Sequence, residues 1–307
     1  MLLRLAELVS SPVAGDETDG GAGGAQGPGT RLQAIVCAGQ LSRDYDDLMA
    51  EFRAAFLAED AQHEEAVEAI IFLRKVAEVW TIAPTQAYAT LQTQLQHRVD
   101  WLRVALQERV PGDAVPRELQ LLKGCVRETE VDRVWALSSM PMARIHHMRS
   151  KFYTDDFFCP MPSLEDDALP FANLLRARQP ELLTVAFDPE GTGPDTHYKV
   201  LQVVAAGLKL SLARGDLDRP DVMVWGYRNV WFVFSPSEAT LIVPVTAADL
   251  NLMHRTFMSC FTTQKEASYP SPHYDGPFSL WAEHLQVNVH TYTYIHIHTH
   301  IHMPRPP

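Results

Sequence analysis

The residues with the clearest chemical potential lie in an acidic turn that ends at a histidine. The apolar run Leu182 to Phe187 is followed by Asp188, Glu190 and Asp195, and then by His197. Neutral imidazole is the commonest protein ligand for a transition metal, and a nearby carboxylate can orient such a ring or act as a base. His197 is therefore a candidate metal ligand. The same spacing also suits a histidine held by structural hydrogen bonds, with Asp195 capping the following helix.

A second pair with possible chemistry is Arg127 and Glu130, which lie three positions apart on one face of a predicted helix. This spacing suits an i,i+3 ion pair. The alternative is a site that recognises an anionic or polyhydroxyl substrate. His146 and His147 are adjacent in a predicted strand, so they face opposite sides of it and cannot both bind one metal ion.

The elements that would position His197 alternate between strands and helices in the second half of the chain. Strands are predicted at residues 144–148, 182–187, 222–227, 230–234 and 241–245, and helices at residues 164–178, 197–214 and 247–261. Such alternation predicts an α/β fold with a mainly parallel sheet covered on its faces. Two close strands around Asn229 predict an antiparallel hairpin at the edge of that sheet.

The first half of the chain is predicted to be mostly helical. Residues 1–9 suit a short amphipathic helix, and residues 10–30, with seven of the sixteen glycines, are expected to form a flexible segment. Leu32 to Ala38 is predicted to be a strand ended by Gly39. From Ser42 to about residue 137 the apolar spacing is helical, with Ser42 expected to cap the first of several helices.

The composition excludes several classes of protein. The 307 residues with 46% apolar content suit one large or two small domains, and the net charge of −12 argues against nucleic acid as the main partner. The four cysteines form no CxxC pair, which favours a reducing, cytoplasmic location. No run approaches the length of a membrane span, and GxGxxG, GxxxxGK[ST], GxSxG and HExxH motifs are absent.

The tail is a low-complexity segment, VNVHTYTYIHIHTHIHMPRPP, and holds five of the thirteen histidines. We expect it to have no fold. The alternative is a weak metal-binding tract, because alternate residues of an extended chain place several histidines on one side.

A series of short motifs follows in order from Arg127 to about Gln286. The matched residues are Arg127 and Glu130 for an Arg-x-x-Glu helix, Phe152 and Tyr153 for an "FY" segment, Asp188 to His197 for an acidic turn and histidine, Val224, Trp225, Tyr227, Arg228 and Trp231 for a "vWxYRxxW" strand pair, and Ile242, Val243, Pro244, Gln264 and Lys265 for the closing elements. This order resembles the PIG-L/LmbE family of zinc-dependent sugar N-deacetylases, in particular the branch fused to a glucosamine-6-phosphate deaminase (isomerase) domain.

The resemblance implies a Rossmann-like α/β domain with its first strand missing and a helical insertion. It also implies an amino-sugar ligand, substrate-binding roles for Arg127 and Asp195, and a zinc ion with His197 as a ligand. Family members carry a His-Pro-Asp-Asp motif that supplies two metal ligands and the base, and no such motif exists here. A catalytic zinc ion needs about three protein ligands and a water. We therefore expect no tightly bound zinc, and the catalytic residues are unknown.

The sequence therefore predicts a deacetylase-like domain of amino-sugar metabolism that is inactive, as either an incomplete fragment or a degenerate relative. A non-catalytic sugar-binding or regulatory module, and a helical interaction protein built on residues 42–137, are the alternatives. The predicted organisation is a helix and flexible segment (1–30), a strand and helical region (31–137), the deacetylase-like region (138–286) and the tail (287–307). The oligomeric state is open.

Overall fold

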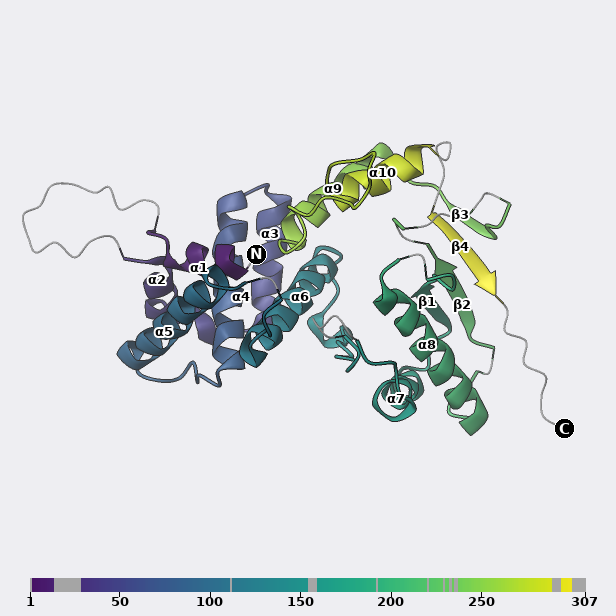
Figure 1. The fold of residues 1–307 in the computed structure, drawn as a ribbon, viewed down its shortest axis with the longest axis horizontal. Helices are drawn as coiled ribbons and strands as arrows, with labels where there is room; N and C mark the ends of the chain where they lie inside the picture. The colour runs from purple at the N-terminus through teal and green to yellow at the C-terminus, as the bar shows by residue number, and fades with distance from the viewer. Residues whose placement is uncertain are drawn as a thin grey trace, which may run out of the picture. The chain divides into compact units, whose positions relative to one another are not determined.

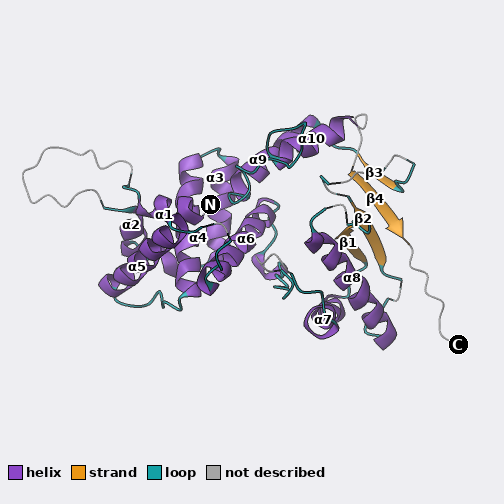
Figure 2. Cartoon of the chain, viewed as in Figure 1, coloured by secondary structure: helices purple, strands orange, loops and turns teal. Residues whose placement is uncertain are grey.

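The structure is a computed structural model that describes residues 2–13, 29–110, 112–153, 159–191, 193–219, 221–228, 230–231, 234, 237–288 and 294–299 (Figure 1). The chain divides into two compact units. The first unit comprises Met1–His146 and Thr256–Glu266, and the second comprises His147–Arg255 and Ala267–Pro307. Figure 2 shows that the described strands all belong to the second unit.

The first unit is built from helices, as the periodicity predicts. Its helices are α1 (Leu2–Ser10), α2 (Arg31–Cys37), α3 (Tyr45–Leu57), α4 (Ala61–Val79), α5 (Tyr88–Gln107) and α6 (Arg117–Leu137), with short 3₁₀ turns at Gln40–Ser42 and Met142–Arg144. Helix α3 begins two residues later than a Ser42 cap would place it, because the Asp44 side chain accepts hydrogen bonds from the backbone N–H groups of Asp46 and Asp47.

The core of the first unit forms where apolar faces of these helices meet. Helix α1 packs against α5, and α3 packs against both α4 and α6. Phe52, Phe56 and Phe72 are among the largest completely buried side chains. Cys260, from the returning segment Thr256–Glu266, belongs to the same core. The predicted helical spacing is thus confirmed, because the apolar stripes are the faces that are buried.

The predicted strand at Leu32 to Ala38 is wrong, because these residues form α2. The helix begins with a capping box, in which Thr30 and Gln33 bond to each other's backbone N–H groups. Leu32, Ile35 and Val36 then face the core at helical spacing. The predicted strand at residues 144–148 is also absent, since a 3₁₀ turn leads there into irregular chain.

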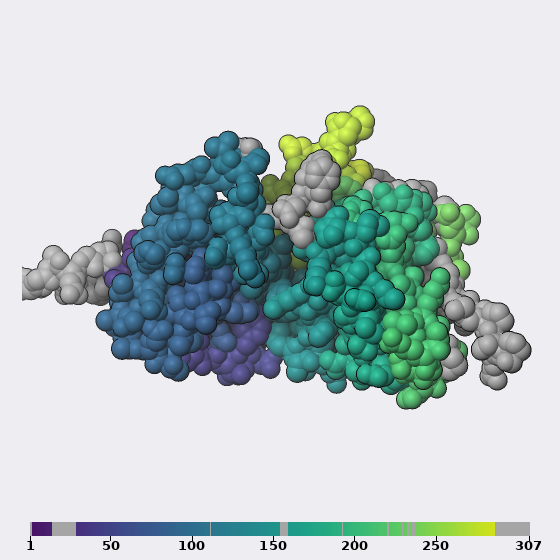
Figure 3. Space-filling view, turned by 60° about the horizontal axis from the view of Figure 1, so that its bottom comes forward, coloured from purple at the N-terminus to yellow at the C-terminus, as the bar shows by residue number. Residues whose placement is uncertain are grey.

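The second unit combines a small sheet with helices. Its elements are a π-helical turn (Leu164–Ala168), α7 (Leu169–Arg178), β1 (Leu182–Ala186), α8 (Asp195–Arg214), β2 (Met223–Tyr227), β3 (Leu241–Val243), the first part of α9 (Ala247–Cys260), α10 (Phe278–Asn288) and β4 (Tyr294–Thr299). Helix α8 packs against α7 and β1. Figure 3 shows the teal-to-green part of the chain, to which α7 and α8 belong, in a space-filling view.

The sheet has the strand order β1-β2-β4-β3. Strands β1 and β2 are parallel, whereas β4 pairs antiparallel with both β2 and β3. The fold is therefore mixed α/β with mostly helices, but among the described strands the sheet is not mainly parallel. Strand β4 falls in the tail, where we expected no fold. The hairpin predicted around Asn229 lies outside the described residues.

The parallel pair is held in place by its own small core. Val185 of β1 and Val224 of β2 pack with Leu175 of α7 and Leu208 of α8. The predicted strands at 182–187 and 222–227 and the predicted helix at 197–214 are confirmed, within two residues at each end. No described helix combines the length and the apolar character needed to cross a membrane.

Candidate functional site

The candidate site lies where the two parallel strands end. Since β1 and β2 run in the same direction, their carboxyl ends share one edge of the sheet, and the Phe187 N–H donates to the Tyr227 carbonyl at 2.7 Å. Asp188 follows directly after this point on the first strand, and Arg228 on the second. We call the group Asp188, Glu190, Asp195, His197, Lys199 and Arg228 the strand-end site.

Arg228 joins the ends of both strands. Its two Nη atoms donate to the carboxylate oxygens of Glu190 at 2.6 and 2.8 Å, and Nη1 lies 3.7 Å from Oδ1 of Asp188. The guanidinium carbon lies 5.5 and 4.8 Å from the ring centroids of Phe187 and Phe234. The hydrogen bonds from Arg228 lower the pKa of Glu190. Both the aromatic rings and the carboxylates therefore hold the guanidinium.

The turn after Asp188 leads into α8 and carries His197. Oδ2 of Asp188 accepts a hydrogen bond of 2.8 Å from the Gly193 N–H. In the first turn of α8, Asp195 forms an ion pair with the buried Lys199, whose Nζ also donates to a loop carbonyl at 3.2 Å. Burial lowers the pKa of the half-buried His197, and the charge of Asp188 opposes this. The lowered pKa favours the neutral form of the imidazole.

The donor set does not fit a complete zinc site. Within the described ranges, no group of three or more His, Cys, Asp or Glu side chains could hold a metal ion. A catalytic zinc ion needs about three protein ligands. His197 has Asp188 as a charged neighbour, and that carboxylate is engaged with Arg228 and Gly193. We derive no catalytic step through a metal at this site.

The other predicted substrate residue, Arg127, belongs to the first unit, whereas Asp195 and His197 belong to the second. Arg127 is exposed on α6. Its neighbour Glu130 is 1% exposed and accepts hydrogen bonds from the Thr263 N–H at 2.6 Å and the Thr263 hydroxyl at 2.8 Å. Glu130 therefore anchors the returning segment of the chain.

Sequence reasoning missed the roles of Arg228, Lys199 and Thr263. Arg228 carries a local signal, because it directly follows an apolar strand and so falls at the same edge as Asp188. Lys199 lies four positions after Asp195, which is ordinary helix spacing for an ion pair. Thr263 has no such signal, since its partner Glu130 lies 133 positions away.

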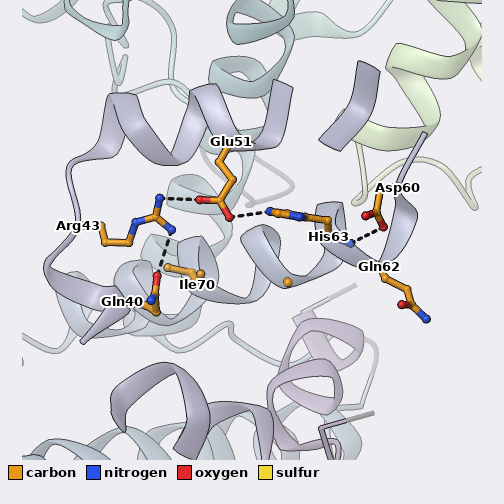
Figure 4. Close-up of a pocket in the computed structure, with 8 residues that line it drawn as sticks. Gln40, Arg43, Glu51, Asp60, Gln62, His63 and Ile70 are labelled. Atoms are coloured by element: carbon orange, nitrogen blue, oxygen red, sulfur yellow. Dashed lines mark hydrogen bonds and ion pairs between the residues drawn. The ribbon is translucent and has the colours of Figure 1, made fainter. Parts of the chain in front are cut away.

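The first unit has a polar cavity of about 500 Å³ between α3 and α4. Figure 4 shows Glu51 between Arg43 and His63, with Gln62 pointing away. Glu51 lies 2.5 Å from Arg43 and 2.6 Å from Nε2 of His63. These hydrogen bonds lower the pKa of Glu51 in spite of its burial. These three side chains pair with one another. Their role is therefore structural, because they join α3 to α4.

Comparisons with known proteins give one distant relationship. No family model and no solved structure matches the chain. The chain is 25% identical over 171 residues to a glucosamine-6-phosphate deaminase-like protein of Bacteroides thetaiotaomicron, a match that covers 55% of this chain. The chain spans about a quarter of that relative's length, since the match covers 25% of it. The match supports a relation to an amino-sugar protein, and the finer deacetylase resemblance stays a proposal.

Proposed function

We propose that this chain is a deacetylase-like domain of amino-sugar metabolism, and that it binds an amino sugar at the strand-end site without hydrolysing it. The observation that carries the proposal is the position of Asp188, Glu190, His197 and Arg228 at the carboxyl ends of a parallel strand pair, where ligands of α/β sheets bind. The similarity to the Bacteroides protein supports an amino sugar as the ligand.

The charges of the site suit hydroxyl and ammonium groups. The carboxylates that reach solvent are Glu190, with 51% of its side chain exposed, and Asp195, with 66% exposed. The cations lie beneath them, since the Arg228 and Lys199 side chains are 8% and 3% exposed. Carboxylates accept hydrogen bonds from sugar hydroxyls and from a protonated amine. A neutral imidazole adds one donor and one acceptor.

Zinc is a further part of this proposal. His197 is the ligand that this chain would offer, and the remaining ligands would have to come from outside the described residues. A zinc ion bound by His197 alone would exchange readily, because one protein ligand falls short of a stable site.

Calorimetric titration with glucosamine and N-acetylglucosamine tests the proposal. Glu190→Gln should weaken glucosamine binding about tenfold, because a charge-assisted hydrogen bond is lost. The matched control is Glu181→Gln, since Glu181 is an exposed carboxylate of the same unit that also pairs with an arginine. His197→Ala should also weaken binding of both sugars, because the donor and the acceptor of the imidazole are lost. Equal losses in the control variant, or no binding of either sugar by the wild type, would overturn the proposal.

The absence of hydrolysis is tested separately. Purified protein is expected to release no acetate from N-acetylglucosamine, with or without added zinc. The same preparation is analysed for zinc beside a full-length variant in which the five tail histidines are replaced by glutamine, so that the histidine-rich tail makes no contribution while β4 is kept. Turnover together with one tightly held zinc ion per chain would show that the protein is a hydrolase.

A further inference from the structure

We propose that Arg228 is a specificity-determining positioning residue of the strand-end site. Its guanidinium fixes the turn between β1 and α8, and its charge sets how strongly the site prefers a cationic sugar over a neutral one. This inference rests on the proposed function, because the preference concerns the same bound sugar. The role of Arg228 in fixing the turn stands on geometry alone.

A series of contacts connects Arg228, which follows β2, to Gly193 in the turn before α8. Arg228 binds both carboxylate oxygens of Glu190 and lies 3.7 Å from Oδ1 of Asp188. The second oxygen of Asp188 accepts the Gly193 N–H. A Cβ atom placed on Gly193 would lie 3.1 Å from Oδ2 of Asp188 and 3.2 Å from the Trp231 ring. The turn is therefore packed closely around the carboxylate that Arg228 holds.

Arg228 is placed to act through these residues rather than on a ligand. Its side chain is 8% exposed and lies against the rings of Phe187 and Phe234, whereas Glu190 is 51% exposed. A ligand at the surface therefore meets the carboxylate and not the guanidinium. The planar, permanently charged guanidinium suits this role, because it can bind a carboxylate through two parallel hydrogen bonds.

The charge of the site depends on Arg228. Asp188, Glu190 and Asp195 face Arg228 and Lys199, so these groups carry one net negative charge when His197 is neutral. Replacement of Arg228 by a neutral residue removes one positive charge from the site and releases both carboxylate oxygens of Glu190 for a ligand. The attraction for a protonated amine then rises, while binding of a neutral sugar gains less.

The first experiment follows the turn without any ligand. Hydrogen exchange of the Gly193 amide is measured by NMR in the wild type, Arg228→Gln and Arg228→Lys. We expect roughly tenfold faster exchange in Arg228→Gln, because the Asp188 acceptor is released, and partial rescue in Arg228→Lys. The control is Arg219→Gln, since Arg219 is an exposed arginine of the same unit that pairs with acids. Unchanged Gly193 exchange in Arg228→Gln would overturn the fixed-turn role.

The second experiment compares glucosamine with glucose at about pH 7, where an amine of this kind is mostly protonated. Arg228→Gln should raise the ratio of glucosamine affinity to glucose affinity about threefold to tenfold. The double variant Arg228→Gln with Glu190→Gln should return the ratio to the wild-type value while the turn stays loose. A purely structural role predicts that both affinities fall together, and an unchanged ratio would overturn the specificity role.

Glu190→Gln alone covers the case in which Arg228→Gln does not fold. This substitution changes a half-exposed residue and should lower the ratio of glucosamine affinity to glucose affinity. An equal or higher ratio would contradict the proposal. If the wild type binds neither sugar, the proposed function and the specificity role both fail. Exchange at Gly193 then still decides whether Arg228 fixes the turn.

Discussion

Glu130 in α6 accepts hydrogen bonds from both the backbone amide and the hydroxyl of Thr263, which lies 133 positions further along the chain. Beside it, Arg133 donates to Glu68 at 3.1 Å and to the Thr262 hydroxyl at 3.4 Å. These buried charges each have partners, as charges removed from water require. The network attaches the returning segment Thr256–Glu266 to the helices of the first unit.

Thr263→Val removes one of the hydrogen bonds to Glu130 while it keeps the shape of the side chain. We expect the first unit to lose about 1–3 kcal/mol of stability, because a buried carboxylate is left with fewer donors. Hydrogen exchange of α6, read by mass spectrometry, measures this loss. Thr93→Val is the control, since Thr93 is exposed and its hydroxyl donates to the Ala89 carbonyl of the same helix. Similar effects of the two substitutions would contradict the role of the Thr263 hydroxyl in holding Glu130.

The stability of the first unit should depend on pH through Glu130. Burial raises the pKa of this carboxyl above its usual 4.5, against the opposing effects of the Thr263 hydrogen bonds and the Arg133 charge. The folded state therefore binds a proton more readily than the unfolded state just above pH 4.5. The resulting stabilisation is complete below the unfolded pKa and is lost as the pH rises through the folded pKa.

Glu130→Gln tests this dependence, because a neutral amide does not titrate. Urea unfolding at a series of pH values should show a flatter dependence in the variant over the window that begins at pH 4.5. Glu118→Gln, at the exposed start of the same helix, is the matched control. An unchanged slope in Glu130→Gln would mean that Glu130 titrates normally.

Two helical glycines should respond oppositely to alanine. A Cβ atom on Gly207 of α8 would lie 2.6 Å from the Phe171 ring and 3.0 Å from the Ala168 carbonyl oxygen. Gly207→Ala should therefore cost about 1–3 kcal/mol through overpacking. A Cβ atom on Gly124 of α6 meets nothing within 4 Å, so Gly124→Ala should stabilise by about 0.5–1 kcal/mol. Thermal unfolding of both variants checks the signs, and destabilisation by Gly124→Ala would count against the packing described.

The cysteines should differ sharply in reactivity. Cys37 is exposed, whereas Cys260 is completely buried, and burial raises the pKa of its thiol to about 12. Because the thiolate is the reactive form, iodoacetamide should label Cys37 in the folded protein and leave Cys260 unmodified. Peptide mass spectrometry measures both sites, and labelling in urea shows that both can react. Equal labelling of the folded protein would place Cys260 at the surface.

The helices of the first unit could be predicted because their evidence is local. Leu91, Leu95, Val99 and Leu102 recur at helical spacing and are the buried residues of α5. The prediction of a strand from Leu32 is wrong for the opposite reason. It is too short for periodicity to distinguish a helix from a strand, and the deciding contact is the capping box of Thr30.

The sequence by itself determined the helical faces, the strand β1 and the acidic turn that leads to His197. Each of these depends on residues within a few positions of one another. Only the tertiary structure decided that Arg228 would clamp Glu190, 38 positions away, and that Glu130 would bind Thr263. Such pairs depend on which surfaces the folded chain brings together, and for Glu130 and Thr263 the spacing along the chain carries no information about that.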